Sequence, residues 1–156
     1  MKILIINIAN KMPGWVNTAC EEYLSRINFG KYSCKIIEIK SAKNPNKATA
    51  EILEDEAKKI SAQIPLGSFV IVLDEKGKNL TSINFAKQLE QISFQYKLIV
   101  LVIGGADGID NKLKQSAHMV LQLSSLTYPH ALVRVILLEQ IYRAVTILEN
   151  HPYHRE

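Results

Sequence analysis

The chain has 156 residues, of which 47% are hydrophobic and 22% are charged. These fractions are ordinary for soluble globular proteins, and they exclude disordered, collagen-like, coiled-coil and disulfide-scaffold chains. The length fits one domain, so we expect residues 1–156 to form a single domain. No run of about 18 apolar residues occurs, so we expect no membrane span and a cytoplasmic protein.

Five short runs rich in Ile, Val and Leu predict strands, at residues 2–8, 34–39, 68–74, 98–103 and 119–123. Helical patterns lie between them, at residues 14–27, 48–63 and 81–92 and in a short piece after Asp110. Several of the strand runs are continuously apolar, which is typical of parallel strands that are covered on both faces. We therefore predict an α/β fold with a parallel-type sheet and helices on both of its faces.

A last helix is predicted over residues 131–149, and apolar side chains occupy most of its circumference. Such a helix has to be covered by more than one neighbour. The pattern itself does not identify the second neighbour, which is either another subunit or the protein's own sheet. We favour another subunit and therefore expect a homodimer.

The net charge of +4 is concentrated in one segment. Residues 31–47 contain five lysines and a single acid, Glu38; the lysines are Lys31, Lys35, Lys40, Lys43 and Lys47. A local excess of positive charge suggests an anionic partner such as nucleic acid. The alternative is a solvated loop that happens to be rich in lysine.

Three of the predicted strands end in loops of unusual composition, at residues 73–77, 104–108 and 124–129. The carboxyl ends of parallel strands meet at one edge of a sheet, where ligands bind in open α/β folds. Residues 104–108 contain three of the seven glycines, which would let a ligand approach bare backbone. The loops thus predict a site for a small organic ligand, although the glycines alone also fit a tight turn.

Several kinds of site are not supported by the motifs. The phosphate-binding loop of NTPases, the dinucleotide fingerprint and the nucleophile elbow of hydrolases are all absent from the sequence. Cys20 and Cys34 form no C-x-x-C pair and the four histidines stand apart from other ligand types, so we expect no metal site. A flavodoxin-like nucleotide-binding module without catalytic activity stays open as the alternative to an enzyme.

The final segment, residues 150–156, reads Asn-His-Pro-Tyr-His-Arg-Glu. Tyr, His and Arg are the side chains that stack on nucleobases or bind their edges, so the segment suits recognition of an unstacked base. The alternative is a frayed end without a function.

These features belong to a set of motifs along the whole chain, namely Lys11-Met12-Pro13, Leu73-Asp74 with Gly77-Lys78, Ile103-Gly104-Gly105, Leu126-Thr127, Pro129-His130 and the ending 150–156. With these motifs the chain resembles the small SPOUT-class RNA methyltransferases. The resemblance is greatest to the bacterial ribosomal large-subunit methyltransferase H family, which methylates N3 of a pseudouridine in 23S rRNA.

The resemblance implies an S-adenosylmethionine site, a trefoil knot in the C-terminal half and an obligate homodimer with its site near the subunit interface. The implied cofactor residues are Leu73, Gly104, Gly105, Leu123, Ser124, Ser125, Leu126, Thr127 and Tyr128. The implied substrate is 23S rRNA, within the ribosome or free.

The catalytic residues that we expect are Glu139, Arg143, Tyr153, His154 and Arg155. Arg143, His154 and Arg155 are candidates to stabilise the anion formed when the imide N3 loses its proton. Tyr153 would hold the base. Glu139 lies one helical turn before Arg143 and either orients it or forms an ordinary i,i+4 pair.

Overall fold

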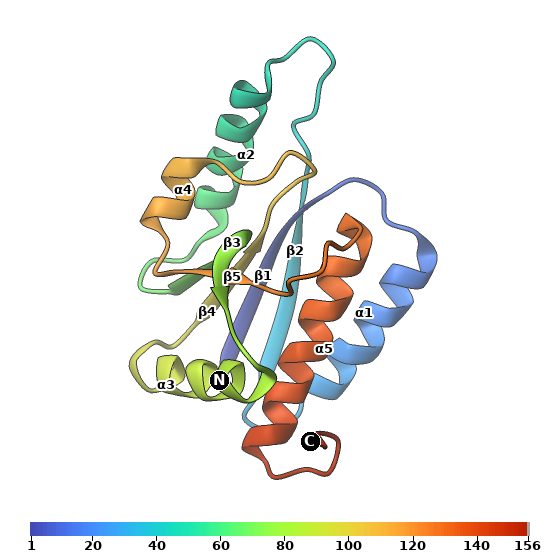
Figure 1. Ribbon diagram of the computed structural model, residues 1–156, viewed down its shortest axis with the longest axis vertical. Coiled ribbons are helices and arrows are strands. Elements are labelled where there is room, and N and C mark those ends of the chain that lie inside the picture. Colours follow the sequence, from blue (N-terminus) through green and yellow to red (C-terminus); the bar gives the residue numbers. More distant parts are fainter. Residues whose placement is uncertain (156) are drawn as a thin grey trace.

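The computed structural model describes residues 1–155 as one parallel sheet with helices on both faces (Figure 1). Its strands are β1 (Lys2–Ala9), β2 (Ser33–Lys40), β3 (Phe69–Asn79), β4 (Ile99–Ile103) and β5 (Met119–Gln122). Its helices are α1 (Gly14–Ile27), α2 (Thr49–Gln63), α3 (Ser82–Gln95), α4 (Asn111–Ser116) and α5 (His130–Leu148). The predicted α/β class and the predicted order of elements are thereby confirmed.

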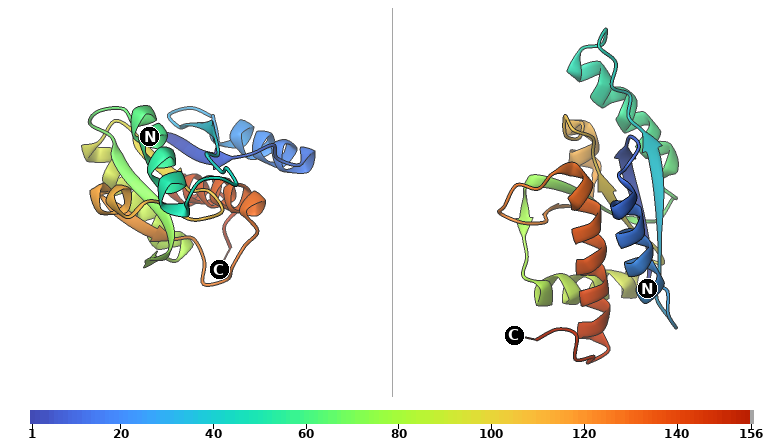
Figure 2. Two further views of the ribbon diagram at one scale, coloured as in Figure 1. Left: turned by 90° about the horizontal axis from the view of Figure 1, so that it is seen from above. Right: turned by 90° about the vertical axis from the view of Figure 1, so that its right-hand side faces the viewer.

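The five strands are all parallel and lie in the order β2-β1-β4-β3-β5. Because side chains alternate along a strand, each strand feeds two cores. On one face Ile5 and Leu101 pack with residues of α1, α3 and α5, and on the other face Ile6 and Val102 pack with residues of α2 and α4. The two helical layers can be followed in Figure 2.

Strand β3 is longer than the sequence predicted. The apolar run ends at Asp74, but β3 continues to Asn79. Leu73 and Lys78 both lie opposite Leu121 of β5, so the residues between them bulge out of the ladder. The extension is polar, and its pairing with β5 rather than its own apolar pattern holds it in the strand.

Gly77 allows the close approach of β3 to β5. A Cβ atom at this position would lie 2.5 Å from the backbone carbon of Leu121 and 2.6 Å from the backbone nitrogen of Gln122. Neither backbone atom can move without breaking the ladder, so any side chain at position 77 would force the two strands apart.

Helix α5 is buried within its own chain over much of its length. It packs on the sheet and contacts both α1 and α3, which leaves Leu137, Leu138 and Ile141 fully buried. The protein's own sheet therefore accounts for part of the apolar circumference. Near the start of the helix Leu132 and Ile136 stay partly exposed, so the proposed subunit contact has apolar surface available.

Among residues 1–155, no helix combines the length and the apolar character that a membrane crossing requires.

We predict that Gly77→Ala lowers the free energy of unfolding by about 1 to 3 kcal/mol, the usual cost of overpacking a tight site. Urea unfolding followed by circular dichroism at a fixed protein concentration measures the change. Gly14→Ala is the matched control, because a Cβ at Gly14 meets nothing within 4 Å. Equal midpoints for the two variants would contradict the close approach of β3 and β5.

Candidate active site

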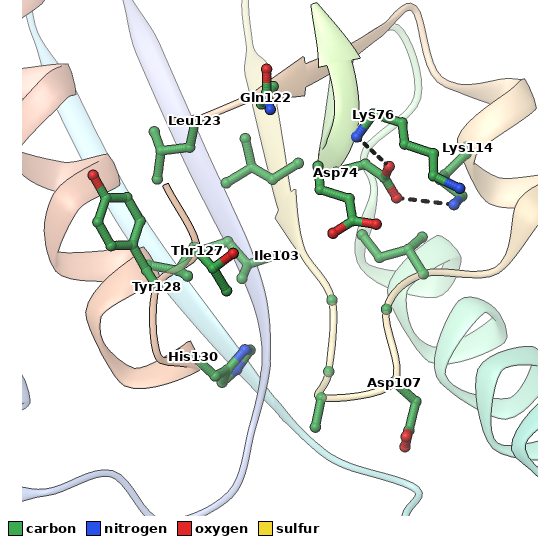
Figure 3. Close-up of a pocket in the computed structure, with 18 of the residues that line it drawn as sticks. Asp74, Lys76, Ile103, Asp107, Lys114, Gln122, Leu123, Thr127, Tyr128 and His130 are labelled. Carbon is green, nitrogen blue, oxygen red and sulfur yellow. Dashed lines mark hydrogen bonds and ion pairs between the residues drawn. The ribbon is translucent and has the colours of Figure 1, made fainter. Parts of the chain in front are cut away.

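A cavity of about 970 Å³ lies at the carboxyl edge of the sheet. Its walls are the bulge within β3 and the loops that follow β4 and β5, together with residues of α2, α4 and the start of α5. The predicted loop at residues 73–77 is thus part of β3. All nine residues expected to bind a cofactor line this cavity: Leu73, Gly104, Gly105, Leu123, Ser124, Ser125, Leu126, Thr127 and Tyr128. In Figure 3 Thr127, Tyr128 and His130 face Asp74 and Lys114 across it, and Asp107 lies on the glycine-rich loop between them.

The glycine-rich loop, residues 104–108, is closed on itself. The Gly108 backbone N–H donates to the Gly105 carbonyl at 3.2 Å, and Gly108 has φ +93°, which favours glycine. A Cβ at Gly104 would lie 2.6 Å from the Gly108 carbonyl oxygen. A Cβ at Gly105 would lie 2.9 Å from a carboxylate oxygen of Glu56. At these two positions glycine is therefore needed for packing within the protein, which is a reason separate from the ligand access that the sequence suggested.

Asp74 holds the loop after Leu73 through two hydrogen bonds. Its carboxylate accepts the Lys76 backbone N–H at 3.0 Å and forms an ion pair with Lys114 of α4 at 2.9 Å. Burial by itself raises the pKa of Asp74, but the bonds from Lys76 and Lys114 outweigh it and the pKa is lowered overall. The charged carboxylate thus ties the bulge of β3 to α4 on one wall of the cavity.

The segment between β5 and α5 forms the opposite wall. Ser124 Oγ accepts from the Leu126 backbone N–H at 2.9 Å and from the Tyr128 hydroxyl at 3.1 Å. His130, the first residue of α5, donates from Nε2 to the Ile8 carbonyl at 2.8 Å. These bonds fix the segment at both ends, so Ser125, Leu126 and Thr127 project from a held loop.

Four of the five expected catalytic residues come together at the other end of α5. The Glu139 carboxylate accepts from Arg143 Nε at 3.0 Å and from the Tyr153 hydroxyl at 3.2 Å. The guanidinium carbon of Arg143 lies 4.9 Å from the centre of the Tyr153 ring, and its NH1 lies 3.4 Å from His154 Nδ1. Arg155 is exposed beyond this cluster. The tail is thereby packed against α5.

The tail cluster and the cavity are separate within one chain. Val133 lines the cavity, and Arg143, ten positions further along α5, belongs to the tail cluster. At a rise of about 1.5 Å per residue, this separation is about 15 Å along the helix axis. None of the five expected catalytic residues lines the cavity.

Known proteins are similar to this chain over its whole length. Residues 1–154 match a family described as a predicted SPOUT methyltransferase. The chain belongs to the SPOUT methyltransferase family. It is also similar to curated proteins named ribosomal RNA large subunit methyltransferase H, with 43% identity to that of Dechloromonas aromatica and 47% to that of Neisseria gonorrhoeae. The alignments cover all of this chain in both cases, with 99% and 100% of the relatives.

A solved structure of a probable methylase family protein from Haemophilus influenzae shares the fold. Its TM-score is 0.54 at 11% sequence identity, and the match covers 99% of this chain and 70% of that one. The family predicted from the motifs and the predicted α/β fold are thus confirmed, whereas the trefoil knot stays a prediction.

Sequence reasoning missed two residues that line the cavity and one that lies behind it. Lys114 and His130 line it and are fixed by Asp74 and by the Ile8 carbonyl, respectively. No pattern marks Lys114, because α4 is short and mostly polar. Glu56 lies behind the glycine-rich loop, and here a signal did exist: it stands between Ile52 and Ile60 at spacings of four, on the buried stripe of α2.

Nowhere in residues 1–155 do three or more His, Cys, Asp or Glu side chains form a group able to hold a metal ion.

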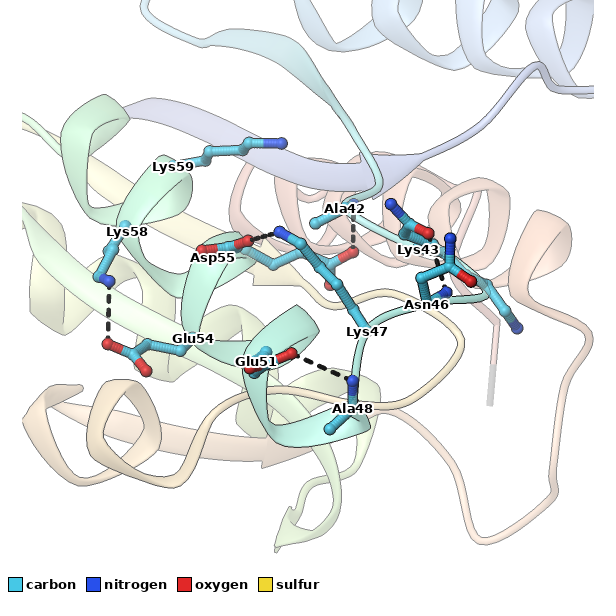
Figure 4. Close-up of polar contacts among 12 residues, drawn as sticks. Ala42, Lys43, Asn46, Lys47, Ala48, Glu51, Glu54, Asp55, Lys58 and Lys59 are labelled. Atoms are coloured by element: carbon cyan, nitrogen blue, oxygen red, sulfur yellow. Dashed lines mark hydrogen bonds and ion pairs between the residues drawn. The ribbon is translucent and has the colours of Figure 1, made fainter.

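The lysines of the 31–47 segment fall into two sets. Lys31 pairs with Glu149 at 2.8 Å and Lys47 pairs with Asp55, while Lys35, Lys40 and Lys43 form no ion pair within residues 1–155. Figure 4 shows Lys47 turned back onto α2 and Lys43 pointing away from it. Two of the five lysines are therefore already paired with carboxylates, and Lys35, Lys40 and Lys43 carry the remaining positive charge of the segment.

We predict that Lys114→Met destabilises the protein by about 0.5 to 1 kcal/mol at pH 7, the worth of a partly exposed ion pair. The pKa of Asp74 is lowered below its ordinary value of 3.8, so the stabilisation is present above that pH and is lost as the pH falls through the folded-state pKa. Urea midpoints at pH 7 and pH 3 measure it. Lys112→Met, on the exposed side of the same helix, should change neither midpoint. A Lys114→Met penalty of equal size at both pH values would refute the ion-pair explanation.

Proposed function

We propose that the protein is a cytoplasmic S-adenosylmethionine-dependent methyltransferase that modifies N3 of a pseudouridine in 23S rRNA of the large ribosomal subunit. The observation that carries the proposal is the single cavity lined by all nine expected cofactor residues in a chain of the SPOUT family. The names of the full-length relatives support large-subunit rRNA as the substrate. A binding module without catalytic activity has no comparable support.

The cavity fits the cofactor of this family. Its volume lies in the range of pockets that enclose small organic ligands. The tight glycine-rich loop presents backbone groups, and Leu73, Leu123 and Leu126 supply apolar surface. When bound there, S-adenosylmethionine supplies a methyl group on a positively charged sulfur, and the residues of the three loops hold and desolvate it.

Because Arg143 of the tail cluster lies about 15 Å along α5 from Val133 of the cavity, we propose that a second copy supplies the tail. The partly exposed residues Leu132, Val135 and Ile136 at the start of α5 give apolar surface for such a contact, beside the cavity. The active protein is then a homodimer in which each site combines the cavity of one subunit with the tail of the other. The trefoil knot that the family implies stays a prediction.

The tail cluster suits stabilisation of an anion rather than proton abstraction. Burial, then the nearby Glu139 carboxylate, raises the pKa of Tyr153 to about 12, so its hydroxyl stays protonated at neutral pH. The carboxylate oxygen of Glu139 already accepts bonds from Arg143 and Tyr153, which makes it an orienting group. We therefore assign none of these three side chains as the base that takes the N3 proton.

His154 completes this assignment. Arginine can only donate hydrogen bonds, so the contact of Arg143 NH1 with His154 Nδ1 makes Nδ1 the acceptor. In the neutral ring the proton then lies on Nε2, a buried atom without a partner among residues 1–155. We propose that the tail rearranges around the base so that this Nε2–H becomes accessible and donates to a carbonyl oxygen beside N3, while Arg155 adds positive charge. Both effects favour the ionised imide, and the proton leaves to water.

We predict that a chain ending at Asn150 keeps its fold, its dimer and its affinity for S-adenosylmethionine but loses methyl transfer to ribosomes. The tail groups that hold the base and stabilise its anion would be gone, whereas every cavity residue would be present. Thr127→Trp, which fills the cavity, should instead lose cofactor binding. Sedimentation, calorimetry and a methylation assay separate these effects.

Mixing the two inactive variants provides the sharper test. Random pairing gives roughly half mixed dimers with one intact site each, so roughly a quarter of the wild-type activity should return. Full activity of the truncated chain would overturn the role of the tail. If the truncated chain is monomeric, the tail is a structural element of the dimer. If the mixture stays inactive although mixed dimers form, each site uses its own tail.

We also predict that Lys40 and Lys43 contribute to RNA binding more than Lys47 does. The double variant Lys40→Gln/Lys43→Gln should reduce the slope of log affinity against log salt by roughly 1 for each lost phosphate contact. Lys47→Gln is the matched control, because Asp55 already neutralises that lysine. Filter binding to a 23S rRNA fragment at several salt concentrations measures the slopes. An unchanged slope in the double variant would show that this segment is a solvated loop that does not contact RNA phosphates.

A further inference from the structure

One buried carboxylate in the protein lies outside the tail and does not line the cavity. Glu56 is 4% exposed and occupies the apolar stripe of α2 between Ile52 and Ile60. A charged group in such a position is costly to bury unless hydrogen bonds compensate it. Glu56 therefore has to be explained by what it contacts.

The first contact is with the loop that follows β2, residues 41–48, here called the lysine loop. Glu56 Oε1 accepts from Ser41 Oγ at 2.8 Å and from the Ala42 backbone N–H at 2.9 Å. Ser41 Oγ in turn accepts the Lys43 backbone N–H at 3.2 Å. The carboxylate thus fixes the backbone that carries Lys43, one of the lysines without an ion pair within residues 1–155.

The second contact is with the glycine-rich loop. A Cβ at Gly105 would lie 2.9 Å from Glu56 Oε2, so the backbone of that loop rests directly on the carboxylate. The opposite side of the same loop lines the cavity. Ala50 and Leu53, on the preceding turns of α2, line the cavity as well. One side chain therefore touches both the lysine loop and the back of the cofactor wall.

We propose that Glu56 is a positioning residue that fixes the glycine-rich loop against the lysine loop and so couples cofactor binding to RNA binding. This inference rests on the proposed function. RNA that holds the lysine loop would restrain the carboxylate, and the carboxylate would hold the cofactor wall in its binding form. Such coupling is reciprocal, so each ligand raises the affinity for the other by the same factor.

The test measures the affinity for S-adenosylmethionine by calorimetry, with and without a 23S rRNA fragment. Glu56→Ala should weaken cofactor binding by about tenfold, within the usual range of coupled sites, and Glu56→Gln should weaken it less. The factor by which RNA strengthens cofactor binding should fall toward one in both. Glu54→Gln is the matched control, since Glu54 lies on the exposed side of α2 and pairs with Lys58. Circular dichroism and sedimentation verify the fold and the dimer.

Each outcome decides between named alternatives. Wild-type affinity and an unchanged RNA effect in Glu56→Ala would overturn the inference and leave Glu56 as an anchor of the lysine loop only. If wild-type protein itself does not bind S-adenosylmethionine, the proposed function fails instead. If Glu56→Ala does not fold, Ser41→Ala decides, because it removes one bond to the lysine loop and leaves the cavity wall in place. An unchanged RNA effect in Ser41→Ala would then overturn the coupling.

Discussion

The cavity exists because all five strands run in one direction. A parallel sheet brings the carboxyl halves of its strands toward one edge, so the bulge of β3 and the loops after β4 and β5 meet although more than 40 residues separate the first from the last. The sheet order places β3 between β4 and β5, so these three strands are direct neighbours. The helices on the two faces then differ in role. Helices α2 and α4 support the cofactor walls from one side, and α5 leads from the cavity to the tail.

The sequence alone predicts most of the elements, because continuous apolar runs and helical periodicity are local properties. It does not predict which strands pair. The polar end of β3 is a strand only because Lys78 and Asn79 pair with β5. The same limit applies to α5, whose apolar circumference is covered partly by α1 and α3, elements distant in sequence.

For the candidate site, the motifs identified the residues that line the cavity more fully than the groups that support them. Glycines and the Leu-Ser-Ser-Leu-Thr segment are unusual in composition and stand at strand ends, so they are visible in the sequence. The sequence does not distinguish Lys114 from the other lysines, and only the structure shows its ion pair with Asp74. Glu56 was visible as a charge within an apolar stripe, but only the packing shows what its two oxygens touch. The sequence also did not show that the tail cluster and the cavity lie apart, because this separation follows from how far α5 extends between them.

The length of α5 has a consequence for how its sequence can vary. A helix carries its side chains around the axis by about 100° per residue, so the cavity end and the tail end are related in rotation as well as in distance. Inserting or deleting one residue between Val133 and Arg143 would change the separation by only about 1.5 Å but would turn the Glu139, Arg143 and Tyr153 cluster to another side of the helix. In a homodimer built through α5, that change of phase would aim each tail away from the neighbouring cavity. In such a dimer the number of residues between the two ends is therefore constrained independently of the side chains that the stretch carries.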